Sequence, residues 1–158
     1  MVAGQTSLDD VDRRLVAELI ADGRVSVNEL ATRANVSRAT AYSRFERLRE
    51  SGVVRGFTAE VDAETLGYGL AVLILVNVEQ GLWPTIRTQL AELPGAEWVG
   101  LTSGGFDFAL LVRVPDVNAL RDVLLVRLQG LDGVRSTQTI FVLDEERRPL
   151  SAFPFPDS

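Results

Sequence analysis

The stretch LAVLILVNV, residues 70–78, constrains the fold of this chain more than any other. It is apolar at nearly every position, and its uninterrupted part, Leu70 to Val76, is far too short to cross a bilayer, which takes about 20 helical residues. A strand with one face in water would alternate apolar and polar side chains. We therefore expect a strand that is covered on both faces.

The residues around this strand repeat a strand–helix–strand pattern twice. The order β-α-β-β-α-β is the ferredoxin-like split arrangement, which predicts an α+β fold. Two helices cover only one face of such a sheet, so we expect a second copy of the chain to cover the other in a homodimer. The alternative is a monomer with linker or tail residues laid across the strand. The expected elements are a strand at 69–80, a helix at 83–95, strands at 96–103 and 106–114, a helix at 115–131 and a strand at 133–143.

The first sixty residues instead predict three helices, at 7–23, 26–35 and 37–52. Each begins with a serine that can cap it, and Asp10 and Glu29 complete S-x-x-D/E capping boxes for the first two. Apolar residues recur at helical spacing in the first helix, which Gly23 is expected to end. Three helices with a short turn before the last form a helix-turn-helix arrangement. The capping serines are Ser7, Ser26 and Ser37, and the apolar stripe is Leu8, Val11, Leu15 and Leu19.

Positive charge gathers on the third expected helix, although the chain has a formal net charge of -6. Residues 33–55 hold six arginines against two glutamates, a net +4. On a helical wheel Ala41, Phe45 and Leu48 face inward, and hydroxyl and guanidinium groups face outward. Such groups suit phosphates and base edges, which predicts a DNA-reading helix; the alternative is a solvated amphipathic helix with internal charge pairs. The residues predicted to contact DNA are Ser37, Arg38, Thr40, Ser43, Arg44 and Arg47.

The chain contains no cysteine, histidine or lysine. Disulfides, thiolate chemistry and cysteine-based zinc sites are thereby excluded, and the usual general base and Schiff-base amine are missing. We therefore expect no enzymatic activity and no cofactor. The first ten residues have neither a basic nor an apolar segment of a secretion signal, so we expect a cytoplasmic protein with no membrane segment.

Four pieces of the N-terminal part occur together: LDDVDRRLVAEL, the spacing through NELATRANVS, the R-x-x-R-L-R-x-S-G-V-V run that begins at Arg44, and the G-F-T-A-x-V-D segment after it. In these pieces the chain resembles the Lrp/AsnC, or feast/famine, family of transcription regulators. The resemblance extends over residues 8 to about 146, because the second half resembles the ligand-sensing RAM domain of that family. The expected dimer pairs two reading helices, which predicts roughly palindromic operators with half-sites about one helical turn, or a multiple of it, apart. The resemblance implies assembly beyond dimers, commonly to octamers, and an amino-acid effector at an interface between C-terminal domains.

The resemblance also implies an effector site. The family pattern G-D-[FY]-D is matched by Gly104, Gly105, Phe106 and Asp107, except that Gly105 replaces an acid, which leaves the effector's identity and existence open. The carboxylate of Asp107 can pair with the ammonium group of an amino acid. Backbone N–H groups at a glycine turn can hold its carboxylate. The alternative is a plain hairpin turn in which Asp107 bonds to backbone. Small polar residues of the last strand complete the expected site: Ser136 and Gln138, flanked by Thr137 and Thr139.

The expected domain organisation has four parts. They are a helix-turn-helix domain at 1–53, a linker strand or hinge at 54–69, the ferredoxin-like domain at 70–146 and a C-terminal tail at 147–158, which is expected to be loose or to lie against a neighbour. An alternative function is a small-molecule sensor whose helical part docks on a protein and has no role with DNA. Salt-dependent affinity for duplex DNA would separate the two.

Overall fold

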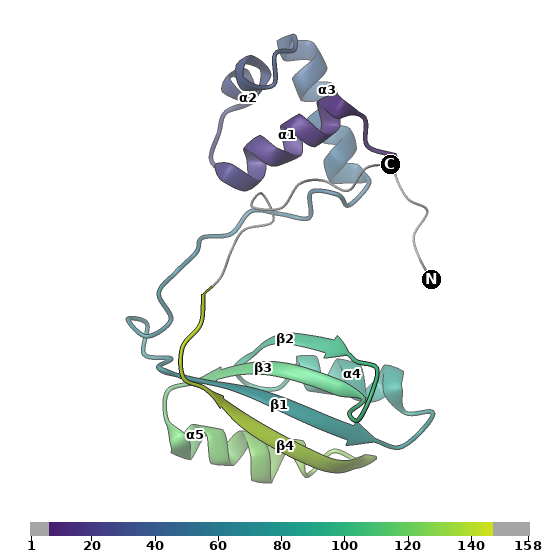
Figure 1. The fold of residues 1–158 in the computed structure, drawn as a ribbon, viewed down its shortest axis with the longest axis vertical. Helices are drawn as coiled ribbons and strands as arrows, with labels where there is room; N and C mark the ends of the chain where they lie inside the picture. The colour runs from purple at the N-terminus through teal and green to yellow at the C-terminus, as the bar shows by residue number, and fades with distance from the viewer. Residues whose placement is uncertain (1–6, 147–158) are drawn as a thin grey trace. The chain divides into compact units, whose positions relative to one another are not determined.

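A computed structural model describes residues 7–146, which form two compact units (Figure 1). The helical unit comprises residues 7–60 together with Glu146, and the sheet unit comprises Val61–Glu145. The division between them lies inside the segment expected to be the linker. The expected C-terminal tail at 147–158 lies outside the described residues.

The helical unit consists of α1 (Asp10–Ala21), α2 (Val27–Arg33) and α3 (Arg38–Glu50). Ser26 and Ser37 cap α2 and α3 as predicted. The prediction that Ser7 caps α1 is wrong, because the cap is Asp9, two residues later. The Asp9 carboxylate accepts a bond from the Asp12 N–H at 2.9 Å, and the Asp12 carboxylate accepts one from the Asp9 N–H at 3.2 Å. This reciprocal box satisfies two donors at the helix start and therefore fixes where α1 begins.

The turn between α2 and α3 depends on Asn35. Its φ of 55° lies in the left-handed region, which asparagine tolerates better than most residues. Its N–H donates to the Thr32 carbonyl, and the next N–H, from Val36, donates to the Ala31 carbonyl. These two bonds form a Schellman ending, which stops α2 sharply and lets α3 start at Ser37 after a minimal turn.

The core of the helical unit is small and rich in alanine. Of the face of α3 predicted to point inward, Ala41 and Leu48 are buried, and Phe45 packs at the edge of the core. The strand considered around Phe57 to Val61 is wrong: residues 55–62 form no strand, and Phe57 stacks on Phe45 instead, with ring centroids 6.3 Å apart. The buried apolar residues are Leu15, Leu19, Leu30, Ala31, Ala34, Ala41 and Leu48.

The sheet unit has the predicted α+β topology. Its antiparallel sheet has the strand order β2-β3-β1-β4, with two helical segments in the connections (Figure 1). Asp116 caps α5 as predicted, and α5 continues through a π-helical segment, η1. The elements are β1 (Leu70–Val78), α4 (Trp83–Ala91), β2 (Ala96–Leu101), β3 (Phe108–Val114), α5 (Val117–Arg121), η1 (Asp122–Leu128) and β4 (Val134–Val142).

The two faces of the sheet differ. Alternate residues of β1, from Val72 to Val78, are buried against α4, α5 and η1 in one apolar cluster. The side chains between them, Leu73 and Leu75 among them, are only half-buried in the single chain. The neighbouring strands add the exposed Trp98 and Ile140 to this second face, opposite Leu111 and Leu73. Within one chain, the helices therefore cover one face of the sheet only, although the sequence predicted that both faces are covered. We call the uncovered face the open face.

No helix among residues 7–146 is long and apolar enough to span a membrane.

Candidate DNA interface and effector site

The start of α3 is organised by hydroxyl groups. The Ser37 Oγ accepts a bond from the Thr40 N–H at 3.0 Å and lies 2.8 Å from the Thr40 Oγ1. The next residue, Arg38, is exposed and has no ion-pair partner among residues 7–146. Three of the predicted DNA-binding residues therefore lie together on the first turn, with one guanidinium available to a ligand.

The exposed face of the first two turns of α3 is formed by Arg38, Ala39, Tyr42 and Ser43. Tyr42 is 60 % exposed and is not among the residues predicted to contact DNA. Its position, four residues after Arg38 on the face away from Ala41 and Leu48, was a signal that could have identified it.

Arg44 and Arg47 lie on the flank of α3 that faces α1. The Arg44 guanidinium bonds with both Asp9 and Asp12, and the Arg47 guanidinium bonds with Asp12. The arginine side chains are 30 % and 47 % exposed, whereas that of Asp12 is 0 % exposed. We call these four residues the ion-pair cluster. The two arginines, expected to face outward, are thus held in part by carboxylates of their own chain.

The sequence contained a signal for this cluster. Asp12 lies four residues after Leu8 and three before Leu15, on the apolar stripe of α1. A carboxylate at such a position has to be paired, because burial of an unpaired charge is very costly.

The ion-pair cluster also sets the electrostatics of the start of α1. The Asp12 backbone N–H, and after it the Arg44 guanidinium, lower the pKa of Asp9 from 3.8 to about 2. Hydrogen bonds to the Asp9 carboxylate, and after it to the Asp12 carboxylate, raise the pKa of Arg44. Both groups are therefore charged at neutral pH, and an anion that approaches Arg44 competes with two carboxylates.

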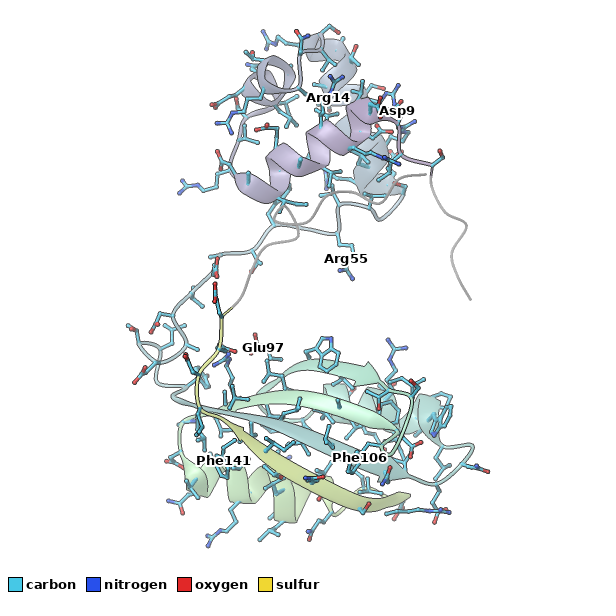
Figure 2. The ribbon with its side chains drawn as sticks, in the orientation of Figure 1. Asp9, Arg14, Arg55, Glu97, Phe106 and Phe141 are labelled. Atoms are coloured by element: carbon cyan, nitrogen blue, oxygen red, sulfur yellow. The ribbon has the colours of Figure 1, made fainter. Side chains whose placement is uncertain are left out.

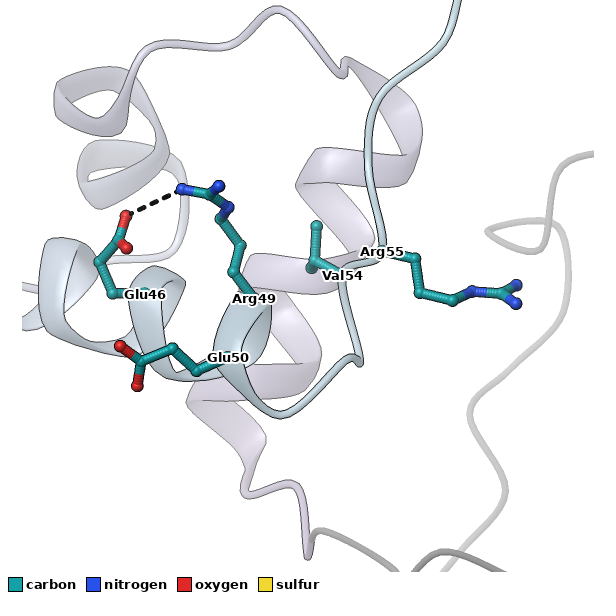
Figure 3. A pocket seen from close by; sticks show the side chains of 5 residues that line it. All are labelled: Glu46, Arg49, Glu50, Val54 and Arg55. Carbon is teal, nitrogen blue, oxygen red and sulfur yellow. Dashed lines mark hydrogen bonds and ion pairs between the residues drawn. The ribbon is translucent and has the colours of Figure 1, made fainter.

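The C-terminal half of α3 offers a different surface. A shallow hollow there is lined by Glu46, Arg49, Glu50, Val54 and Arg55 (Figure 3). Arg49 pairs with Glu46 at 3.5 Å, and the Arg55 side chain points away from both (Figure 3). The hollow therefore combines two carboxylates with two guanidinium groups, whereas the exposed side chains of the first two turns of α3 include no carboxylate.

The turn before β3 brings together the expected effector residues. The Asp107 carboxylate accepts a bond from the Val78 N–H at 2.8 Å, at the end of β1. The Thr102 hydroxyl donates to the Phe106 carbonyl at 2.6 Å and the Thr102 N–H to the Asp107 carbonyl at 2.9 Å, which closes the turn. Gly104, at the tip, has a φ of 125° that favours glycine. The bond from Asp107 to backbone is the one that the hairpin alternative anticipated.

The last strand contributes from the other side of β1. Ser136 is paired with Asn77, whose side-chain amide donates to the Ser136 Oγ at 3.2 Å. Gln138 is paired with Leu75, one step further along the open face. Asp107 and Ser136 therefore flank the same end of β1, near which Phe106 lies, whereas Phe141 lies near the opposite end of the sheet (Figure 2). Asn77 was not selected from the sequence, because its polar role emerges only from the strand register.

Comparison with known families accounts for both units. Residues 8–49 match the AsnC-type helix-turn-helix domain, and residues 71–150 match the Lrp/AsnC ligand binding domain. The chain belongs to the Lrp/AsnC family. Among its relatives, LrpA of Mycobacterium tuberculosis is 37% identical over 137 residues, which cover 86% of this chain and 91% of LrpA. The leucine-responsive regulatory protein of Escherichia coli is 33% identical over 144 residues, covering 89% of this chain and 88% of that protein.

Solved structures of Lrp/AsnC proteins have the same fold. A transcriptional regulator from Neisseria meningitidis in complex with L-Met superposes with a TM-score of 0.83 at 26% identity, covering 94% of this chain and 97% of that one. AsnC of Escherichia coli gives a TM-score of 0.80 at 26% identity, covering 90% and 96%. The predicted fold class is thereby confirmed. This Lrp/AsnC chain is a DNA-binding transcriptional regulator of the helix-turn-helix type and not an enzyme.

Proposed function

We propose that this Lrp/AsnC regulator reads specific duplex DNA sequences with the first two turns of α3 in the major groove. The supporting observation is the outward face of those turns, which carries a guanidinium without a carboxylate partner among residues 7–146, together with hydroxyl groups. Recognition helices of this type present their N-terminal residues to base edges. The glutamates Glu46 and Glu50 lie further along the helix, where they do not oppose this approach.

In this assignment the six predicted residues have different roles. Arg38 forms the strongest contact, with a phosphate or a guanine edge. Ser43 donates or accepts a bond beside it. Ser37 and Thr40 mainly fix the first turn, because the Thr40 N–H donates to the Ser37 Oγ and the two hydroxyl groups bond to each other. Their hydroxyl groups lie at the rim of this turn. Arg44 and Arg47 add positive potential from the ion-pair cluster, and Arg47, the more exposed, reaches a phosphate with its remaining N–H groups.

The regulator functions as a dimer through the open face of the sheet. Leu73, Leu75 and Leu111 are only half-buried there, with the exposed Trp98 and Ile140 beside them. A contiguous apolar patch of this kind marks an interaction surface. Arg113 on the same face does not oppose association, because it pairs with Glu97 at 2.7 Å and with Glu145. A two-fold dimer presents two reading helices, so the operators are palindromic, and further assembly to octamers follows the family pattern.

A small molecule, an amino acid, binds where Asp107 and Ser136 flank the end of β1. One relative is named as leucine-responsive, and another was crystallised with L-Met. The bond from Val78 to Asp107 uses one carboxylate oxygen, which leaves the other for an ammonium group. Backbone N–H groups at Gly104 and Gly105 are suited to the effector carboxylate, and Phe106, Ser136 and Gln138 to its remainder.

The DNA assignment is tested by fluorescence anisotropy with the duplex upstream of this protein's own gene, against a scrambled duplex, over a salt series. We expect selective, salt-sensitive binding that the variant Arg38→Ala weakens about tenfold, the magnitude typical of one good base or phosphate contact. Arg121→Ala, which removes an arginine from the sheet unit, is the matched control and leaves affinity unchanged. Equal affinities of Arg38→Ala and the wild type for the specific duplex would remove Arg38 from the interface.

The role of Asp107 in effector binding is tested by a variant that removes its negative charge but keeps its hydrogen bond to the backbone. Asp107→Asn keeps an oxygen that can accept the Val78 N–H but removes the negative charge. We expect it to abolish the response of DNA binding to a panel of amino acids while the fold and basal DNA affinity are retained. A full response from Asp107→Asn would show that Asp107 holds only the backbone.

Sedimentation at micromolar concentration tests the dimer, and a stable monomer would contradict the role of the open face.

A further inference from the structure

One large side chain on the outward face of α3 has no role in the assignment above. Tyr42 is 60 % exposed, and neither its ring nor its hydroxyl contacts another ring or hydrogen-bond partner in the described part of the chain. The other aromatic side chain of α3, Phe45, is packed against Phe57 and lies under the Arg49 guanidinium, 5.8 Å from the ring centroid. No ring contact or hydrogen bond within residues 7–146 therefore explains an aromatic residue at this position.

The neighbours of Tyr42 define what surface it belongs to. Arg38, one turn earlier, supplies a positive charge with no ion-pair partner in residues 7–146, and the exposed Ser43 lies beside Tyr42. Ala39, three residues earlier, is exposed on the same side of the helix and is the other apolar side chain there. Tyr42 and Ala39 therefore form a small apolar strip between polar groups, on the turns that enter the groove if the proposed function holds.

We propose that Tyr42 is a specificity-determining residue that contacts the C5-methyl group of a thymine in the major groove. This inference rests on the proposed function of α3. Among the four bases only thymine presents an apolar group at the edge of the major groove, and alanine and aromatic side chains pack against it. Ala39 extends the contact. The Tyr42 hydroxyl, at the far end of the ring, remains at the rim of the groove.

A contact with phosphate through the Tyr42 hydroxyl is the competing interpretation. A phosphate contact would strengthen binding to every sequence about equally, whereas a methyl contact discriminates thymine at one position in each half-site. The two are separable chemically, because Tyr42→Phe removes only the hydroxyl and replacement of thymine by deoxyuridine removes only the methyl group.

The experiment uses the full chain and a duplex recovered by repeated selection from a randomised pool of 30 base pairs. Each thymine of that duplex is replaced in turn by deoxyuridine, and affinities are measured by anisotropy for wild type, Tyr42→Phe and Tyr42→Ala. The control variant is Tyr68→Ala, which removes the other tyrosine of the chain, itself 47 % exposed and in the sheet unit. Circular dichroism verifies that each variant is folded.

We expect one thymine in each half-site at which deoxyuridine weakens the wild type about fourfold, which corresponds to the ~0.8 kcal/mol of one buried methylene-sized group. Tyr42→Phe and Tyr68→Ala keep this sensitivity, and Tyr42→Ala loses it. Undiminished sensitivity at every thymine in Tyr42→Ala, or a uniform loss in Tyr42→Phe on all duplexes, would overturn the inference while the DNA role stands. If selection recovers no preferred sequence, the proposed function itself fails, and the inference with it.

Discussion

The helical and sheet units are stabilised by different means. The sheet unit buries fourteen apolar residues in one cluster, none of them alanine. The helical unit buries seven, three of which are alanines, and adds the fully buried carboxylate of Asp12 between two arginines. A core of small side chains lets helices approach closely but contributes little area. The ion-pair cluster instead joins α1 to α3, and it is sensitive to the loss of either partner because a buried charge has to be paired.

The largest expected effect tests the apolar side of this comparison. Phe108, at the start of β3, is completely buried. Phe108→Ala should lower the stability of the sheet unit by about 4 kcal/mol, through lost burial and the cavity left behind. Hydrogen exchange followed by mass spectrometry reports each unit separately, and protection of α1 to α3 should be unchanged. Equal loss of protection in both units would mean that they unfold together.

The second-largest expected effect tests how much the ion-pair cluster contributes to the stability of the helical unit. Asp12→Ala leaves two arginines without their buried partner, and we expect the helical unit to lose about 3 kcal/mol, the lower end for a broken buried pair because both guanidinium groups still contact water. Glu18→Ala, which breaks an exposed pair with Arg33, should cost under about 1 kcal/mol. Denaturant titration of both variants measures the difference. Similar losses would show that burial of Asp12 adds nothing.

A smaller effect concerns the start of α3. Ser37→Ala removes the cap and should cost about 1 kcal/mol, as N-cap replacements do. It should also weaken DNA binding, because the first turn frays. Ser26→Ala removes the cap of α2 and is the matched control: a similar loss of stability is expected in a thermal melt, with a smaller loss of affinity in the anisotropy assay. Equal losses of affinity would indicate that only global stability matters.

The smallest effect is a difference in acid sensitivity. Because the pKa of Asp9 is lowered from 3.8 to about 2, its contribution is complete above pH 4 and is lost as the pH falls towards 2. Asp9→Asn keeps a capping side chain without this titration. Between pH 4 and 2, the helical unit of the wild type should therefore lose more stability than that of Asp9→Asn, as measured by circular dichroism melts. Parallel curves would contradict a stabilising charge at Asp9.

Periodicity and capping patterns predicted most of the fold. The strand–helix order, the caps Ser26, Ser37 and Asp116 and the inward face of α3 follow from contacts within a few residues along the chain. The start of α1 was misplaced because Ser7 and Asp9 both precede acceptable boxes, and the pairing of Asp9 with Arg44 favours the second. The segment at 57–61 alternates like a strand, but Phe57 finds an aromatic partner in Phe45, and no strand pairs with it in residues 7–146.

Local sequence patterns predicted the candidate site residues and their contacts less well. A helical wheel represents a single helix and shows none of its neighbours. It therefore placed Arg44 and Arg47 on the outward side and could not predict their bonds to α1. Asn77 lies beside Ser136 only through the register of β1 and β4. Tyr42 is not among the predicted residues, because arginine and the aliphatic hydroxyl groups of serine and threonine defined the outward face of the wheel.

The strand order has a consequence for the order in which the units form during synthesis. The three helices are complete within residues 7–60, and their contacts join segments close in sequence, which favours rapid folding. The central strand β1 instead pairs with the last strand, Ala71 opposite Val142, so its second edge stays unpaired until most of the chain has left the ribosome. The helical unit can therefore be folded while the apolar β1 is still unpaired on one edge, and during that interval the nascent chain is most exposed to aggregation.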